Sequence, residues 1–115
     1  MTNASNQAAA EKAAALDRYA RQQLEADFLW LMSQEQGRRF MWELLGKCNL
    51  FATSFNTHGG LMTLSEGKKQ IGYQYLHDIN TLCPARYVQM MEEANEAQRS
   101  RELQLEQAQE TETND

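Results

Sequence analysis

The chain has 115 residues, a formal net charge of −5 and 42% hydrophobic residues, with two cysteines and a single proline. A chain of this length forms one domain at most, and none of its apolar runs approaches the ~20 residues that a membrane-spanning helix needs. Cys48 and Cys83 fit no zinc or thioredoxin spacing and no signal segment opens the chain, so we expect reduced thiols in a cytosolic protein.

The negative charge is concentrated at the C-terminal end. Residues 92–115 contain eight acidic residues and two arginines, so residues 1–91 have a formal charge of +1. The low pI therefore describes the tail and says little about the part that folds. We expect a disordered N-terminus over residues 1–10, a helical domain over residues 11–97, and an acidic, partly disordered tail over residues 98–115.

The N-terminal third of the chain predicts one long helix. Alanine triplets at 8–10 and 13–15 have high helix propensity. The apolar residues that follow recur at the three- and four-residue intervals of a single helix face: Leu16, Ala20, Leu24, Phe28 and Leu31. We expect a helix from about residue 8 to residue 32, with this face packed in a bundle core rather than in a heptad coiled coil.

A second helix is predicted over residues 34–47. Ser33 and Gln36 have the spacing of a capping box. Apolar residues then follow at helical intervals: Phe40, Met41, Leu44, Leu45 and Cys48. The next segment is rich in Asn, Thr, Ser and Gly, which predicts a loop, but it retains Phe51 and Phe55. We expect these two rings to fold back over the helices.

Two further helices complete the predicted fold. Ser65 is a candidate cap for a helix from Glu66 to about Cys83, and Gly72 would permit a close helix crossing. The inner stripe expected for this helix is Ile71, Tyr75, Ile79 and Leu82, and that of the helix opened by Pro84 is Tyr87, Met90, Met91 and Ala94. These elements predict an all-α fold, a small three- to four-helix bundle with a long N-terminal helix.

Arg38 and Arg39 lie near Trp42 in the second predicted helix and are the first candidate interaction residues. Two interpretations are open. The arginines contact nucleic-acid phosphate or an acidic protein surface, or they form ion pairs at helix spacing, Arg38 with Glu35 and Arg39 with Glu43. Trp42 adjoins an apolar stripe, which favours a place in the core or in an interface over base stacking.

Lys68 and Lys69 are the second candidate interaction residues, because they open the predicted third helix after Glu66 and Gly67. Backbone amides and two ammonium groups at a helix start attract anions, but the segment lacks the first glycine and the Ser or Thr of a P-loop. Lysines at a helix start also oppose the helix dipole. This mismatch favours an interaction role, with a solvated pair as the alternative.

Four motifs follow one another between Phe28 and Glu93. They are a GRRF-type helix at 37–40, a loop with Phe51 and Phe55, an EG(R/K)-type helix start at 66–68, and a final helix with Pro84, Tyr87, Met91 and Glu92. In this order the motifs resemble the Bbp19-like family of small bacteriophage proteins. The sequence departs from the family pattern at Lys68 and Lys69, where the resemblance leads us to expect an arginine.

The resemblance implies a non-enzymatic bacteriophage structural or assembly protein, a small virion-associated component that contacts other phage structural proteins in the virion or the host cytoplasm. A homo-oligomer is a further expectation, because about sixty residues of core are marginally stable alone. The alternative is a phage nucleic-acid-associated or host-regulatory protein. The net charge of −5 and the lack of a recognition helix count against nucleic acid as a partner.

The residues that carry most enzyme chemistry are sparse. His77 and Asp78 are adjacent, but no Ser or Cys nucleophile lies at a spacing that implies partnership with them. The cysteines and histidines at 48, 58, 77 and 83 lack the short paired spacings of structural zinc sites. We therefore expect no enzymatic activity, no metal and no cofactor.

Overall fold

The computed structural model describes residues 2–51 and 59–114, and these ranges contain helices and no strand. The helices are α1 (Thr2–Ser33), α2 (Glu35–Lys47), α3 (Gly59–Leu82) and α4 (Pro84–Asn114). The prediction of an all-α fold is confirmed. Pro84 opens α4 as expected, because its missing N–H is one that a first helical turn leaves without an intrahelical partner.

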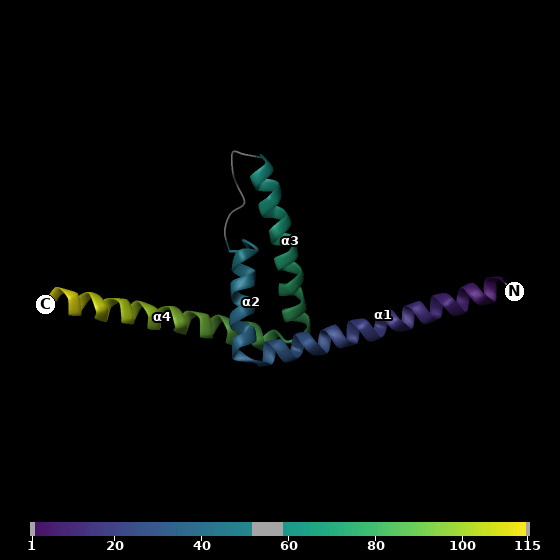
Figure 1. The fold of residues 1–115 in the computed structure, drawn as a ribbon, viewed down its shortest axis with the longest axis horizontal. Helices are drawn as coiled ribbons and strands as arrows, with labels where there is room; N and C mark the ends of the chain where they lie inside the picture. Colours follow the sequence, from purple (N-terminus) through teal and green to yellow (C-terminus); the bar gives the residue numbers. More distant parts are fainter. Residues whose placement is uncertain (1, 52–58, 115) are drawn as a thin grey trace.

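The helices form an extended shape rather than the compact bundle expected from the sequence. In Figure 1, α2 and α3 lie side by side, while the free ends of α1 and α4 point in opposite directions away from them. The molecule measures 88 × 40 × 21 Å. Its radius of gyration of 21.9 Å compares with about 13 Å for a globular domain of this length. Most of both long helices therefore lies outside the core.

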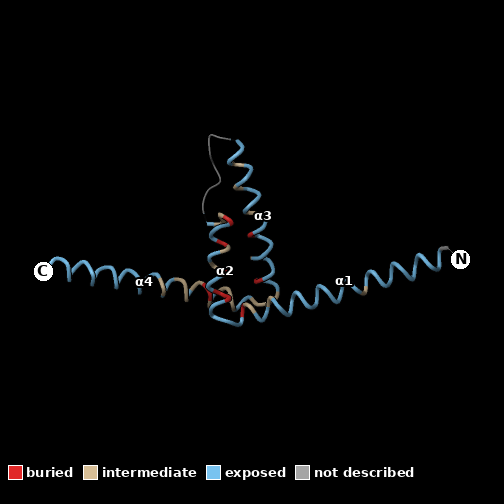
Figure 2. Tube along the Cα trace, in the orientation of Figure 1, coloured by how far each residue is buried: buried red, intermediate tan, exposed pale blue. Residues whose placement is uncertain are grey.

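The core lies where the four helices meet, and much of it is methionine. Its buried members are Met32, Met41, Leu45, Ile79 and Met90. Half-buried residues pack around them, including Phe28 and Leu31 from α1 and Tyr87 from α4. Figure 2 shows the buried residues gathered at the centre, with the outer parts of α1 and α4 exposed. Flexible thioether side chains fill the irregular space between helices that cross at steep angles.

Only the last two turns of α1 take part in this core. Phe28 and Leu31 are half-buried as expected, but Leu16, Ala20 and Leu24 are exposed. The prediction that the whole stripe packs in a core is therefore wrong. The reason is tertiary, because α1 extends from the start of α2 away from the other helices, and its first twenty-odd residues lie outside the core (Figure 1).

Both ends of the chain are helical. The helix α1 begins at Thr2, where disorder was expected over residues 1–10, and the alanine-rich sequence accounts for the helix. The helix α4 continues to Asn114, where a partly disordered tail was expected over residues 98–115. Arg99 pairs with Glu96 at 2.9 Å, and the Gln98 amide donates to Glu102 at 3.0 Å. The division into a domain over residues 11–97 and two flanking segments stays a prediction.

Two expected helix starts differ in the structure. The capping box is not formed, because Ser33 belongs to α1 and its hydroxyl donates to the Trp30 carbonyl at 2.6 Å. Gln34 precedes α2 without a side-chain cap. The helix α3 begins at Gly59 rather than Glu66, so Ser65 lies inside the helix, where its hydroxyl accepts a hydrogen bond from the Asn49 amide. Asn49 follows Cys48, the C-cap residue of α2, and has a φ of 64°, a left-handed conformation that asparagine tolerates.

Gly72 determines which face of α3 points inward. A Cβ at this position would lie 2.8 Å from Cys48 Cβ, so the expected close helix crossing is confirmed. Ile79 is buried and Leu82 is half-buried on the same side. Ile71 and Tyr75 are exposed, contrary to the predicted stripe, because the end of α2 packs against the glycine and this contact rotates both side chains outward.

The expected inner face of α4 is confirmed. Met90 is buried, and Tyr87, Met91 and Ala94 are half-buried. The two phenylalanine rings were expected to fold back over the helices, and the structure describes one of them. Phe51 is 59% exposed, and Phe55 lies outside the described residues.

Candidate interaction site

The turn between α1 and α2 depends on a glycine. Gly37 is buried in the first turn of α2, and a Cβ added to it would lie 1.9 Å from the carbonyl oxygen of Leu31. No side chain fits at that distance, so α2 can approach the end of α1 this closely only with glycine at residue 37. The GRRF-type motif therefore begins with a packing requirement.

The next residue of the motif joins three helices. Arg38 is only 6% exposed. Its Nε donates to Glu93 Oε1 on α4 at 2.6 Å, and its Nη1 donates to the carbonyl oxygen of Met32 at 3.0 Å. That carbonyl belongs to the last turn of α1, where the helix itself supplies no donor. The pairing of Arg38 with Glu35, one of the two interpretations left open by the sequence, is not formed, because burial directs the guanidinium to α4 and the end of α1.

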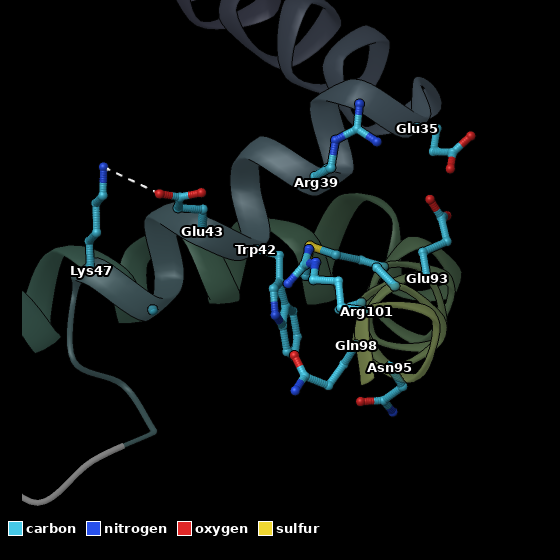
Figure 3. Close-up of a pocket in the computed structure, with 13 residues that line it drawn as sticks. Glu35, Arg39, Trp42, Glu43, Lys47, Glu93, Asn95, Gln98 and Arg101 are labelled. Atoms are coloured by element: carbon cyan, nitrogen blue, oxygen red, sulfur yellow. Dashed lines mark ion pairs between the residues drawn. The ribbon is translucent and has the colours of Figure 1, made fainter. Parts of the chain in front are cut away.

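A groove lies beside this junction, between α2 and α4. Its volume is about 630 Å³. Figure 3 shows Trp42 of α2 close to Gln98 and Arg101 of α4, whereas the Arg39 side chain points away from these three; all four residues line the groove. Trp42 is half-buried and stacks on Phe51, with ring centroids 5.3 Å apart and an interplanar angle of 29°. The groove thus has an aromatic wall whose position is set by packing.

The charged side chains around the groove are of both signs. Glu43 pairs with Lys47 at 3.6 Å, and both side chains are largely exposed, so water screens this pair. Arg39 does not form the expected pair with Glu43. Neither Arg39 nor Arg101 has an ion-pair partner in the part of the chain that the structure describes. Two guanidinium groups, one from α2 and one from α4, can therefore bind carboxylates of another molecule.

Lys68 and Lys69 lie elsewhere. They sit in the interior of α3, whose start at Gly59 leaves them more than a turn away from the free amides of the helix end. Lys68 is exposed, Lys69 is half-buried, and neither lines the groove. The structure therefore brings together Arg39 and Trp42 of the predicted interaction residues. It places Arg38 in the interior and keeps the two lysines apart from the groove.

Sequence reasoning did not find the α4 side of the groove. Gln98 and Arg101 lie in the segment predicted as an acidic tail, and Glu93 lies before it, among the eight acidic residues of 92–115. One signal was present: Met90, Ala94, Ala97 and Arg101 recur at intervals of four, three and four residues, which places them on one helix face. This pattern continues past residue 97 and could have extended the interacting part of α4.

The thiols take no part in the groove. Cys48 is buried, Cys83 is half-buried, and both are free, as expected. Burial raises the pKa of the Cys83 thiol, and the nearby positive charge of Arg86 partly offsets this. Within the described ranges no cluster of His, Cys, Asp and Glu could hold a metal ion. No helix in the same ranges is long and apolar enough to cross a membrane.

Comparison with known proteins identifies one related family. A family model described as Bbp19-like phage protein matches residues 28–92, which is more than half of the chain. The match starts at Phe28, the first core residue of α1, and runs through α2 and α3 into the first part of α4. No curated protein and no solved structure matches the chain.

Proposed function

Since the chain belongs to the Bbp19-like phage protein family, we propose that it is a structural or assembly component of a bacteriophage that acts through contacts with other phage proteins. The groove between α2 and α4 is the observation that carries the proposal. It combines a half-buried tryptophan with two arginines that lack partners among the described residues. Tryptophan and arginine are the residue types that dominate the energetics of protein interfaces.

The groove fits a segment of another phage protein that carries an apolar side chain and at least one carboxylate. The apolar side chain would pack on Trp42, whose ring is held in place by Phe51. Carboxylates would bind Arg39 or Arg101, because a guanidinium donates two parallel hydrogen bonds to a carboxylate. The exposed Glu35 and Glu43 at the α2 edge would disfavour other orientations of an acidic segment.

Nucleic acid is the competing partner, and the charge distribution supports it less well. The groove is lined by Glu35, Glu43 and Glu93 as well as by arginines. Beyond Arg101, α4 carries Glu102, Glu106 and Glu110, all of them exposed. A phosphate backbone lying along the groove would meet these carboxylates, and the repulsion would offset the counterion release on which nucleic-acid binding depends.

The test is incorporation into phage particles. Phage carrying Arg39→Glu together with Arg101→Glu are purified, and the protein is quantified in the virions by mass spectrometry. We expect the wild-type protein to be present and the double variant to be reduced at least tenfold. Arg99→Glu is the matched control, because Arg99 lies on α4, is exposed and does not line the groove.

Three results would contradict the proposal. The wild-type protein could be absent from virions and from assembly intermediates, or the double variant could be incorporated as well as the control. Alternatively, the purified wild-type chain could retain DNA at about 50 mM salt and release it by about 200 mM, the salt dependence of phosphate binding. The last result would favour the nucleic-acid alternative.

A further inference from the structure

The part of α1 that lies outside the core has an exposed apolar face. Nine residues between 12 and 30 fall on one side of the helix at its 3.6-residue period: Lys12, Ala13, Leu16, Tyr19, Ala20, Gln23, Leu24, Asp27 and Trp30. Leu16 is 59% exposed, Tyr19 and Leu24 are each 68% exposed, and Trp30 is 66% exposed. The opposite side carries Arg18, Arg21 and Glu25. The side chains of this apolar face, called the α1 face below, are all exposed.

The exposed area of the chain is larger than a monomer of its mass requires. The accessible surface is 9150 Å², whereas a globular monomer of 13.2 kDa exposes about 6,400 Å². The excess is comparable to what one subunit buries in an obligate dimer, about 1,000–2,500 Å². A helix whose apolar face stays in water gains nothing from packing, so isolated helices are marginally stable. A partner on the α1 face would remove this apolar area from water and would stabilise the helix by packing.

We propose that the α1 face binds the α1 face of a second copy of this chain, with the two helices antiparallel. The apolar stripe contains two charges of opposite sign, Lys12 near one end and Asp27 near the other. In an antiparallel pair each lysine meets the aspartate of the other copy. In a parallel pair each lysine would lie beside the lysine of the other copy, and each aspartate beside the other aspartate, so like charges would be placed together. The face is therefore complementary to itself in one direction only.

The same register matches the apolar residues by size. With Lys12 opposite Asp27, Leu16 lies opposite Gln23 and next to Leu24 of the second copy, and the twofold axis passes between Tyr19 and Ala20. Trp30 then falls opposite the second copy's alanine-rich start, near residue 9, where small side chains leave room for an indole ring. A twofold pair of this kind is the commonest form of homo-oligomer.

The other long helix lacks such a face. Leu103 and Leu105 of α4 are 57% and 60% exposed, but they are two residues apart and so point to different sides of the helix. The glutamates between residues 102 and 112 would repel a second copy of α4. Pairing through α1 therefore leaves α4 and the groove between α2 and α4 free, and it does not depend on the function proposed above.

The first test is the molar mass of the full chain in solution. Sedimentation equilibrium of the wild-type chain at tens of micromolar should give twice the mass of one chain. Leu16→Glu with Leu24→Glu should give a monomer with the same core, because both side chains lie outside it. Leu103→Glu with Leu105→Glu is the control and should remain a dimer. A monomeric wild-type chain, or a dimer lost only in the control, overturns the proposal.

The second test is the direction of the pair. Ala20→Cys should form an intermolecular disulfide on mild oxidation, because residue 20 lies next to the twofold axis. Ala13→Cys should not, because it faces residue 26 of the second copy. The wild-type chain controls for Cys48 and Cys83. Equal cross-linking of both variants would show a parallel pair, and cross-linking of neither would show that α1 does not form the contact; either result overturns the proposal.

Discussion

Arg38 Nε and Glu93 Oε1 lie 2.6 Å apart and join residues that are 55 positions apart in the chain. The same guanidinium bonds the Met32 carbonyl at the end of α1. One side chain of α2 thereby positions α1 and α4, and the second of these helices forms half of the groove. Arg38, a candidate interaction residue from the sequence, is therefore a buried residue that links three helices, and the candidate site depends on it.

Replacing Arg38 by Ala should destabilise the chain by about 2–4 kcal/mol. Removing one partner of a buried ion pair leaves the other charge uncompensated, and the partial exposure of Glu93 reduces the cost below that of a fully buried pair. Chemical denaturation measures the change. Arg39→Ala is the control and should stay within about 0.5 kcal/mol of wild type. Equal midpoints for the two variants would contradict a structural role for Arg38.

Gly37→Ala should lower the free energy of unfolding by about 1–3 kcal/mol. The alanine Cβ would lie 1.9 Å from the carbonyl oxygen of Leu31, which cannot move independently of α1. Gly46→Ala in the same helix meets nothing within 4 Å. It should instead raise stability by about 0.5–1 kcal/mol through helix propensity. Thermal or urea denaturation distinguishes the two, and the same sign for both substitutions would refute the close α1–α2 contact.

Gly72→Ala tests the crossing of α3 with the end of α2. Its Cβ would lie 2.8 Å from Cys48 Cβ and 2.9 Å from Leu50 Cγ, so the helices must separate at a cost of about 1–3 kcal/mol. Gly67→Ala has open space and should be stabilising by about 0.5–1 kcal/mol. If Gly72→Ala unfolds at the wild-type denaturant concentration, the two helices are not in contact there.

The Cys83 thiol should make stability pH-dependent under alkaline conditions. Burial raises its pKa in the folded chain, so the unfolded chain loses this proton first. The contribution is present below the unfolded pKa of about 8.5 and is lost as pH rises through the higher folded value. Cys83→Ser should unfold with a weaker pH dependence between pH 8 and 10. Alkylation of Cys83 at pH 8 should also be slower in the folded chain than in denaturant.

Removing residues 1–10 and 100–115 should leave the core intact. All described side chains in these segments are exposed, and none belongs to the core. The melting temperature of this truncated chain should stay within a few degrees of the full chain at concentrations where both are monomeric. Loss of the cooperative transition would mean that the domain extends beyond the residues 11–97 predicted from the sequence.

The elements of this fold followed from local signals in the sequence. Alanine-rich segments and helical spacing predicted the helices, and Pro84 marked the boundary between α3 and α4. Gly72 marked a close crossing, and the stripe beginning at Tyr87 marked the inner face of α4. These signals are readable because propensity, capping and periodicity act between residues a few positions apart.

The roles of individual side chains depended on contacts between distant parts of the chain. Arg38 and Arg39 are adjacent and chemically identical, yet one is buried against Glu93 while the other lines the groove. Nothing local distinguishes them, because the difference arises from which helix lies opposite each one. Ile71 faces solvent for the same reason, since Gly72 brings α2 onto the neighbouring face of α3. Local sequence therefore determined where helices form, and the tertiary structure decided which of their side chains are available to a partner.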